Sequence, residues 1–236
     1  MLHRAAATRG LTKIDWLTSY HTFSFGDYQD ANWRRFNNFR VLNDDYITPG
    51  SGFPTHGHQD MEIITLVLSG GLAHRDSTGG EGVILPGEVQ VMTAGTGIRH
   101  SEFNASTEAP GHFLQLWVFP KEKGLTPSYR NWDGNFLTKG ESGVWQLAAS
   151  VDGAGGSVAL NADAAIRVVR LSAGQEVPLK IASPGTWLHV ASGAVSVGAA
   201  RLTAGDGVGL IPGNIADSVK AAEDSIVLAV DTLSDV

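Results

Sequence analysis

The sequence predicts an all-β protein built from two antiparallel β-barrels in tandem. Short runs of β-branched and aromatic residues recur along the chain, turn-forming residues separate them, and long helical periodicity is scarce. Glycine, which tight turns favour, occurs 29 times among the 236 residues. Cysteine is absent, so we expect neither disulfides nor thiolate ligands.

The expected strands extend over most of the chain. Gly, Pro, Asn and Asp supply the turns between them. The strand-like runs are FRVLNDDYI (39–47), EIITLVL (62–68), GVILP (82–86), VQVMTAG (89–95), FLQLWVFP (113–120), VWQLAAS (144–150), SVAL (157–160), IRVVRLS (166–172), TWLHVASGAVSV (186–197), GVGLIP (207–212) and SIVLAVD (225–231).

The two halves of the chain have a similar pattern. Residues 62–94 and residues 186–219 both contain a strand, a glycine turn, a further strand and a Pro-Gly turn. This self-similarity indicates a duplicated small barrel. The polar stretch at residues 120–135 is expected to link the copies, which gives an N-terminal domain over 1–128 and a C-terminal domain over 129–236.

His56 and His58 stand one residue apart in the stretch FPTHGHQDMEIITLVLSG. Side chains at positions i and i+2 of an extended segment lie on one face, whereas on a helix they would diverge. If the strand is continuous, the same face carries Asp60 and Glu62. The alternative is a pair of exposed loop histidines near Pro54.

A second pair with this spacing follows in MTAGTGIRHSEFN, where His100 and Glu102 come after two glycines that permit a tight turn. Three imidazoles and one carboxylate form a workable ligand set for one divalent transition metal, with positions left for water or substrate. The C-terminal half offers only His189, which is expected to be structural. We therefore expect the metal in the N-terminal half.

Composition excludes several classes of partner. The formal net charge is −7 and no run of Lys or Arg occurs, so direct binding of nucleic acid is not expected. No segment is apolar for long enough to span a bilayer, and the first residues lack the apolar core of a signal peptide. We expect a cytoplasmic protein without a membrane partner.

The motifs resemble those of a known family. THGHQDMEIITLVLSG is similar to the first cupin motif and GIRHSEFN to the second. Together with WLTSYHTFSFGDY (16–28), FRVLNDDYI and HRDSTG (74–79), they make the chain resemble a pirin, a bicupin of the bacterial quercetin 2,3-dioxygenase-like type. The resemblance is dense over residues 10–130; beyond residue 135 it rests on the duplicated pattern and the length.

The resemblance implies a ligand set residue by residue. Pirins hold one metal, usually assigned as iron, through residues that correspond here to His56, His58, His100 and Glu102. Iron(II) is therefore the expected metal, with manganese, cobalt, nickel, copper and zinc as alternatives. Glu62 stands where other cupins place their carboxylate ligand, and is expected to act from outside the ligand set. The C-terminal barrel of pirins lacks ligands.

The resemblance also implies an activity. Pirins of this type resemble dioxygenases that cleave a flavonol with O₂ and release carbon monoxide, after a carboxylate takes the proton of the 3-hydroxyl group. Glu102 is our first choice for this base and Glu62 the second. A flat apolar slot should bind the aromatic substrate, with Phe53, Phe103, Phe113 and Trp117 near the motifs, although most of these are expected in the core.

Two other functions stay open from the sequence. Eukaryotic pirins resemble transcriptional cofactors, so the chain could be a metal-dependent regulator or redox sensor that binds a protein partner. It could also be a cupin isomerase or another metal enzyme with an unrelated substrate. Nothing in the sequence names the substrate, and the intact four-residue site favours metal chemistry.

Overall fold

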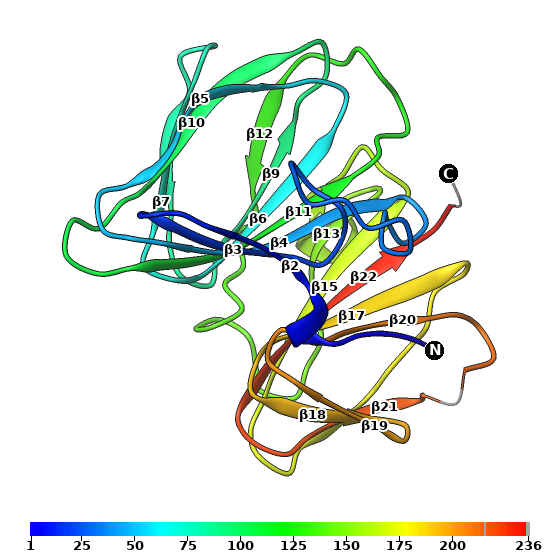
Figure 1. Ribbon diagram of the computed structural model, residues 1–236. Coiled ribbons are helices and arrows are strands. Elements are labelled where there is room, and N and C mark those ends of the chain that lie inside the picture. The colour runs from blue at the N-terminus through cyan, green and yellow to red at the C-terminus, as the bar shows by residue number, and fades with distance from the viewer. Residues whose placement is uncertain (215, 235–236) are drawn as a thin grey trace.

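Two β-barrels pack against each other in the computed structural model (Figure 1). The structure describes residues 1–214 and 216–234. In these ranges the strands form two seven-stranded and two four-stranded sheets, and the only helical elements are the 3-10 turns η1 (Ala6–Thr8) and η2 (Ala154–Gly156). No helix of the described residues is long and apolar enough to cross a membrane. The predicted all-β tandem-barrel architecture is confirmed.

The first barrel contains the predicted metal ligands. Its large sheet has the order β12 (Ser128–Asn131), β9 (Val89–Thr93), β6 (Glu62–Ser69), β11 (Gly111–Val118), β4 (Phe39–Ile47), β3 (Leu17–His21) and β2 (Gly10–Lys13). Its small sheet has the order β5 (Gly52–His58), β10 (Ile98–Asn104), β7 (Leu72–Asp76) and β8 (Glu81–Ile84).

The second barrel repeats this plan. Its large sheet has the order β1 (Leu2–Arg4), β20 (Gly207–Leu210), β17 (Gly185–Ser192), β22 (Ser225–Thr232), β15 (Ala164–Leu171), β13 (Gln146–Ser150) and β14 (Val158–Ala159). Its small sheet has the order β16 (Glu176–Pro178), β21 (Ser218–Ala221), β18 (Ala194–Val197) and β19 (Ala200–Thr203). The order β9-β6-β11-β4 thus recurs as β20-β17-β22-β15, and β5-β10-β7-β8 recurs as β16-β21-β18-β19, which supports the predicted duplication.

The two large sheets contribute to one shared hydrophobic core. Alternate side chains of each strand point to opposite faces, so one face of each sheet lines its own barrel and the other can meet the partner sheet. Leu114 and Leu116 of β11 lie in the same cluster of buried side chains as Ile166 of β15 and Leu228 of β22. Trp187 of β17 is fully buried in that cluster.

Aromatic rings from the first half of the chain surround Trp187. The ring centroids of Phe23, Phe36 and Trp33 lie 5.0, 5.6 and 6.1 Å from its indole. All three belong to the long connection between β3 and β4. Burial of such large rings is a major source of stability, so this connection joins the two barrels as well as two strands.

Two strands bear on the expected division into domains. β1, at the very start of the chain, pairs with β20 of the second barrel, which the sequence did not indicate (Figure 1). β12 begins at Ser128 and pairs with β9 of the first barrel. The boundary between residues 128 and 129 stays a prediction, and we propose that the N-terminal unit extends through Asn131.

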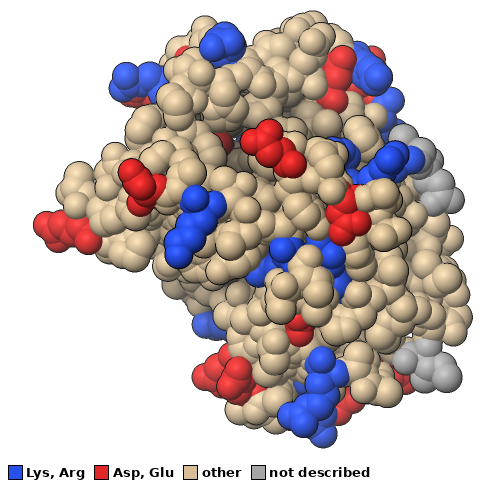
Figure 2. Space-filling model, viewed as in Figure 1, with Lys and Arg blue, Asp and Glu red and all other residues tan. Residues whose placement is uncertain are grey.

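Charged side chains of both signs are mixed on the surface shown in Figure 2. Blue and red groups alternate over both barrels, without a continuous field of one sign on this face (Figure 2). The net charge of −7 is therefore not gathered into a single acidic patch on the side that is visible.

Candidate metal centre

The predicted histidines lie on two neighbouring strands of the small sheet in the first barrel. β5 and β10 are antiparallel, and His100 stands directly opposite His56 in their register. The segment that holds His56 and His58 is extended, as the spacing argument required. Gly95 and Gly97 both have positive φ, 46° and 128°, in the turn before β10, so the predicted tight glycine turn is confirmed.

The three imidazoles converge on one point. The Nε2 atom of His100 lies 3.1 Å from the Nε2 atoms of both His56 and His58. In the described residues these three side chains form the only group of metal-ligand type, with the ligand atoms within 4.8 Å of one another. Because His56 Nδ1 donates to the Pro54 carbonyl oxygen at 2.9 Å, its Nε2 atom keeps a free lone pair.

The electrostatics of the triad favour neutral imidazoles. Burial, together with the neighbouring His100 and His56, lowers the pKa of His58 to about 3. Burial, followed by the nearby His56 and His74, lowers the pKa of His100 to about 4. At neutral pH these rings therefore present the unprotonated form that binds metals.

A divalent metal fits these donors. Lone pairs that face one another repel, and a cation between them removes the repulsion. Metal–imidazole bonds are about 2.0–2.1 Å long, so two nitrogens on one ion lie within about 4.2 Å of each other. The 3.1 Å separations satisfy this limit. The donor set, imidazole without sulfur, suits iron, nickel, copper, cobalt and zinc.

Glu102 lies beside the histidine triad on β10. Its Oε2 atom is 3.7 Å from His100 Nε2, and both carboxylate oxygens accept hydrogen bonds from the Gln115 side-chain amide at 3.1 Å. Burial raises the pKa of Glu102, against the opposing effects of His56 and the Gln115 hydrogen bond. A buried carboxylate needs a compensating charge, and a metal at the triad would provide it.

Glu62 lies outside this site. Its Oε2 atom accepts hydrogen bonds from Thr93 Oγ1 at 3.1 Å and from the Asn161 backbone N–H at 3.2 Å, and lies 3.9 Å from Arg130. None of these residues lines the pocket beside the histidines. Glu62 instead shares its strand face with Ile64, which belongs to the core between the barrels. Its buried carboxylate links the first barrel to Asn161 of the second.

The expectation that one continuous strand places Asp60 and Glu62 on the same face as the histidines was wrong, and the reason is local. β5 ends at His58, β6 begins at Glu62, and the two strands belong to different sheets. Asp60, between them, adopts a φ of +47°, which is outside the extended region. The turn at Asp60 therefore breaks the alternation of faces on which the sequence argument depended.

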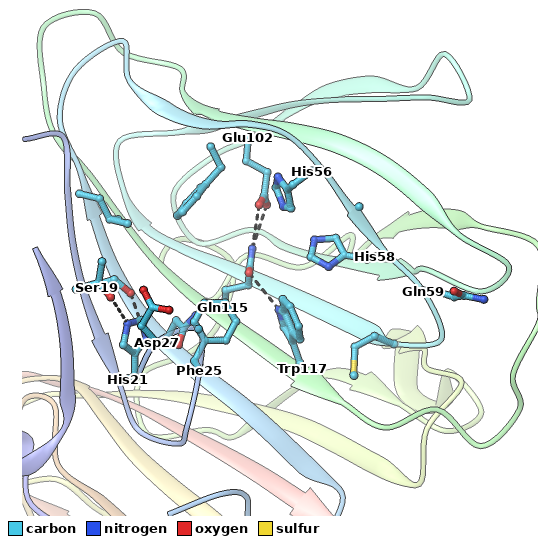
Figure 3. Close-up of a pocket in the computed structure, with 17 residues that line it drawn as sticks. Ser19, His21, Phe25, Asp27, His56, His58, Gln59, Glu102, Gln115 and Trp117 are labelled. Atoms are coloured by element: carbon cyan, nitrogen blue, oxygen red, sulfur yellow. Dashed lines mark hydrogen bonds between the residues drawn. The ribbon is translucent and has the colours of Figure 1, made fainter. Parts of the chain in front are cut away.

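A pocket of about 610 Å³ opens beside the triad. Figure 3 shows His56, His58 and Glu102 around one end of the pocket and Ser19, His21 and Asp27 at the other. The remaining lining residues are Thr12, Leu17, Phe25, Gly26, Asn43, Phe53, Gly57, Gln59, Met61, Gln115 and Trp117. This volume is within the range of pockets that bind small molecules.

Aromatic side chains form much of the apolar wall. The indole of Trp117 meets His58 edge-on at 5.0 Å between centroids and Phe25 at 5.3 Å. Of the four aromatic residues considered from the sequence, Phe53 and Trp117 line the pocket. Phe113 is buried in the core and Phe103 is exposed elsewhere on the surface. The expectation that most of the four lie in the core was therefore wrong.

Several residues of the site could not be found from sequence spacing. The Tyr129 hydroxyl lies 3.1 Å from His100 Nδ1, and the Tyr129 ring stacks on His74 with centroids 4.8 Å apart. Gln115 holds Glu102, as described above. Both residues reach the site through strand pairing over long sequence distances, and only the folded sheet brings them there.

The second barrel has apolar side chains where the first has its histidines. β16 and β21 correspond by strand order to β5 and β10. The central one of their three opposed pairs is Val177 and Val219, which are both buried. The interior of this barrel is filled by aliphatic side chains. His189 is fully buried, on a strand position two residues from Trp187 and thus on the side of the core between the barrels.

The fold and the site define a bicupin with a candidate metal centre in its first barrel. The family profile described as Pirin matches residues 4–118, and the profile described as Quercetinase C-terminal cupin domain matches residues 147–232. The chain belongs to the pirin family.

Relatives and solved structures agree with this assignment. The chain is 40% identical to a quercetin 2,3-dioxygenase of Escherichia coli (strain K12) over 97% of its own length and 96% of the relative's. It is 38% identical to a pirin-like protein of Caulobacter vibrioides, over 92% of each chain. A crystal structure of the bacterial pirin YhhW from Escherichia coli in complex with nickel(II) superposes with a TM-score of 0.90, at 38% identity and over 99% of each chain.

Proposed function

We propose that this pirin is a metal-dependent dioxygenase that cleaves a flavonol-type substrate with O₂ and releases carbon monoxide. The convergence of three histidine Nε2 atoms at one end of a 610 Å³ pocket carries the proposal. The relatives named quercetin 2,3-dioxygenase support the reaction class.

The histidines and Glu102 would hold one divalent metal. Iron(II) is our first choice, and manganese, cobalt, nickel, copper and zinc could occupy the same site. When bound, the metal would act as a Lewis acid that stabilises negative charge on a substrate oxygen. The Pro54 carbonyl and the Tyr129 hydroxyl would fix the orientation of His56 and His100 through their Nδ1 atoms.

Glu102 would also be the base. Its carboxylate lines the pocket. Burial raises the pKa of Glu102 towards neutral pH, where a carboxylate accepts a proton more effectively. It would take the proton of the flavonol 3-hydroxyl, while Gln115 keeps the carboxylate oriented. Phe25, Phe53 and Trp117 would bind the flat rings and exclude water from the reacting carbon atoms.

Anaerobic titration with quercetin tests this proposal without turnover. The metal-loaded protein should shift the absorption of quercetin at a stoichiometry of one per chain, because deprotonation of the 3-hydroxyl changes the electronic state of the ring system. Removal of the metal by a chelator should abolish the shift. A spectrum that is identical with and without metal would contradict the proposed mode of binding.

A further inference from the structure

The end of the pocket away from the metal centre is formed by β3 and by the residues that follow it. Ser19, His21 and Asp27 line the cavity at the end opposite His58, and Phe25 lines it between the two ends (Figure 3). They lie in the stretch WLTSYHTFSFGDY, residues 16–28, which takes no part in the metal centre. The conformation of this segment therefore shapes the pocket in a region distant from the proposed chemistry.

A row of polar side chains connects the two ends. Gln115 of β11 stands opposite Asn43 of β4, and Asn43 stands opposite His21 of β3. All three line the pocket, so they share the inner face of the sheet. Neighbouring strands are about 4.8 Å apart, which places Asn43 about 8 Å or less from the Glu102 carboxylate held by Gln115.

The hydrogen bonds of His21 determine how Asn43 is oriented. His21 Nδ1 lies 2.8 Å from Asn43 Oδ1, and His21 Nε2 lies 2.9 Å from Thr12 Oγ1. The amide oxygen can only accept, so Nδ1 carries the proton and Nε2 accepts from the Thr12 hydroxyl. Burial lowers the pKa of His21, which favours the neutral ring.

Asn43 is left with a free donor group. Its oxygen is engaged by His21, whereas no described residue accepts a hydrogen bond from its Nδ2 atom. The side chain is only 3% exposed and lines the pocket, so its N–H groups are available mainly to a molecule in the cavity. The amide faces the cavity, so an oxygen atom of a ligand bound there can accept a hydrogen bond from Nδ2.

The walls between the two polar ends are apolar. The rings of Phe25 and Trp117 meet edge-to-face at 85°, and Phe53, Leu17 and Met61 complete the lining. A molecule that fills this space therefore needs a flat apolar body with an oxygen at each end.

We propose that Asn43, oriented by His21, determines specificity by donating a hydrogen bond to a phenolic oxygen of the substrate, remote from the group that binds the metal. The substrate class is then a polyphenol with at least one hydroxylated ring beyond its metal-binding hydroxyl. This inference rests on the proposed function and specifies which flavonols the site should prefer.

Two flavonols that share the metal-binding group provide the test. Quercetin and 3-hydroxyflavone both carry the 3-hydroxyl and its adjacent carbonyl, but only quercetin has further phenolic oxygens. Dissociation constants would be measured anaerobically by quenching of tryptophan fluorescence, with the full-length protein loaded with nickel(II). Asn43→Leu should weaken quercetin binding about tenfold and leave 3-hydroxyflavone within about twofold of wild type, as expected for loss of one hydrogen bond.

Asn43→Asp guards against a folding defect, because it keeps an oxygen for His21 and nearly the same side-chain volume while it replaces the N–H donors with a carboxylate oxygen. It should also reduce the preference for quercetin. Asn214→Leu, the same change in a turn of the second barrel, is the matched control and should bind both flavonols as wild type does. His58→Ala should weaken both ligands together.

The outcomes separate the two proposals. Equal effects of the Asn43 substitutions on both flavonols, or no effect on either, would overturn the specificity role and leave the proposed function intact. Failure of wild-type protein to bind either flavonol would overturn the proposed function, and this inference with it.

Discussion

The Gln115 side-chain amide donates to both carboxylate oxygens of Glu102, at 3.1 Å each. The carbonyl oxygen of the same amide accepts from the Trp117 indole N–H at 3.1 Å, so the amide cannot exchange its two ends without losing these bonds. Gln115 therefore links the carboxylate of the metal centre to an aromatic wall of the pocket (Figure 3). We therefore expect substitutions of Glu102 to reduce proton transfer more than they destabilise the fold.

Glu102→Gln should lower turnover about 100-fold or more, while metal content falls much less. The amide still offers an oxygen to the metal but cannot accept a proton at neutral pH. Steady-state oxygen uptake and elemental analysis of the same samples would measure the two effects.

Glu62→Gln is the comparison for this variant, since it makes the same change in a buried carboxylate that does not line the pocket. It should leave turnover within a few-fold of wild type and mainly lower the melting temperature, because Glu62 joins the barrels through Asn161. Equal losses of turnover in the two variants would return Glu62 to the list of candidate bases.

His56→Ala should reduce the bound metal from one ion per chain to a small fraction of that. The substitution removes one of the three converging Nε2 atoms and leaves two imidazoles and the Glu102 carboxylate, which should hold a metal much more weakly. Inductively coupled plasma analysis after dialysis would measure it, with His3→Ala on β1 as the matched control. Full occupancy in His56→Ala would refute the assigned site.

Tyr129→Phe should weaken metal binding about 10-fold to 100-fold, because His100 Nδ1 loses the hydroxyl that orients the ring. The aromatic ring that stacks on His74 is retained, so the melting temperature of the metal-free protein should change little. Competition with a chelating dye would give the affinity, and Tyr20→Phe on β3 is the control. An unchanged affinity would show that the hydroxyl does not act through His100.

The sequence was sufficient for the parts of the site that depend on local alternation. His56 with His58, and His100 with Glu102, share a face because each pair lies within one strand. Glu62 was misplaced because the turn at Asp60 separates it from β5. The alternation of polar and apolar residues does not indicate where the backbone adopts a positive φ.

Other features depend on pairing between distant segments. Tyr129 reaches His100 only because β12 adds to the edge of the large sheet. β1 pairs in the second barrel although it precedes every strand of the first barrel in the sequence. Strand pairing of this kind is decided by packing of the whole sheet and leaves no local pattern in the sequence.

His189 should make stability depend on pH. This ring is fully buried beside Arg9, Asp44, His112 and Asp206, and burial, followed by the positive charge of Arg9, lowers its pKa to about 4. The ordinary pKa of histidine is about 6.5, so between these values the unfolded chain binds more protons than the native protein. The stability that depends on neutral His189 is therefore present above about pH 6.5 and is lost as the pH falls towards 4.

The difference in unfolding free energy between wild type and His189→Leu would isolate this effect from other titrating groups. Wild type should lose about 3 kcal/mol relative to the variant when the pH falls from 6.5 to 4, on the basis of the pKa difference. Urea titrations at several pH values would measure it. Parallel stability curves for the two proteins would be inconsistent with a neutral, buried His189.

Carbon monoxide release measured together with oxygen uptake tests the central claim most directly. Metal-loaded protein supplied with quercetin in air should release one carbon monoxide for each O₂ consumed, because both oxygen atoms enter the cleaved flavonol as the carbon monoxide leaves. A chelator, or the His58→Ala substitution, should abolish both signals. If the metal-loaded protein consumes no oxygen and releases no carbon monoxide, the dioxygenase proposal is wrong, and the metal centre would have to serve a regulatory role or another reaction.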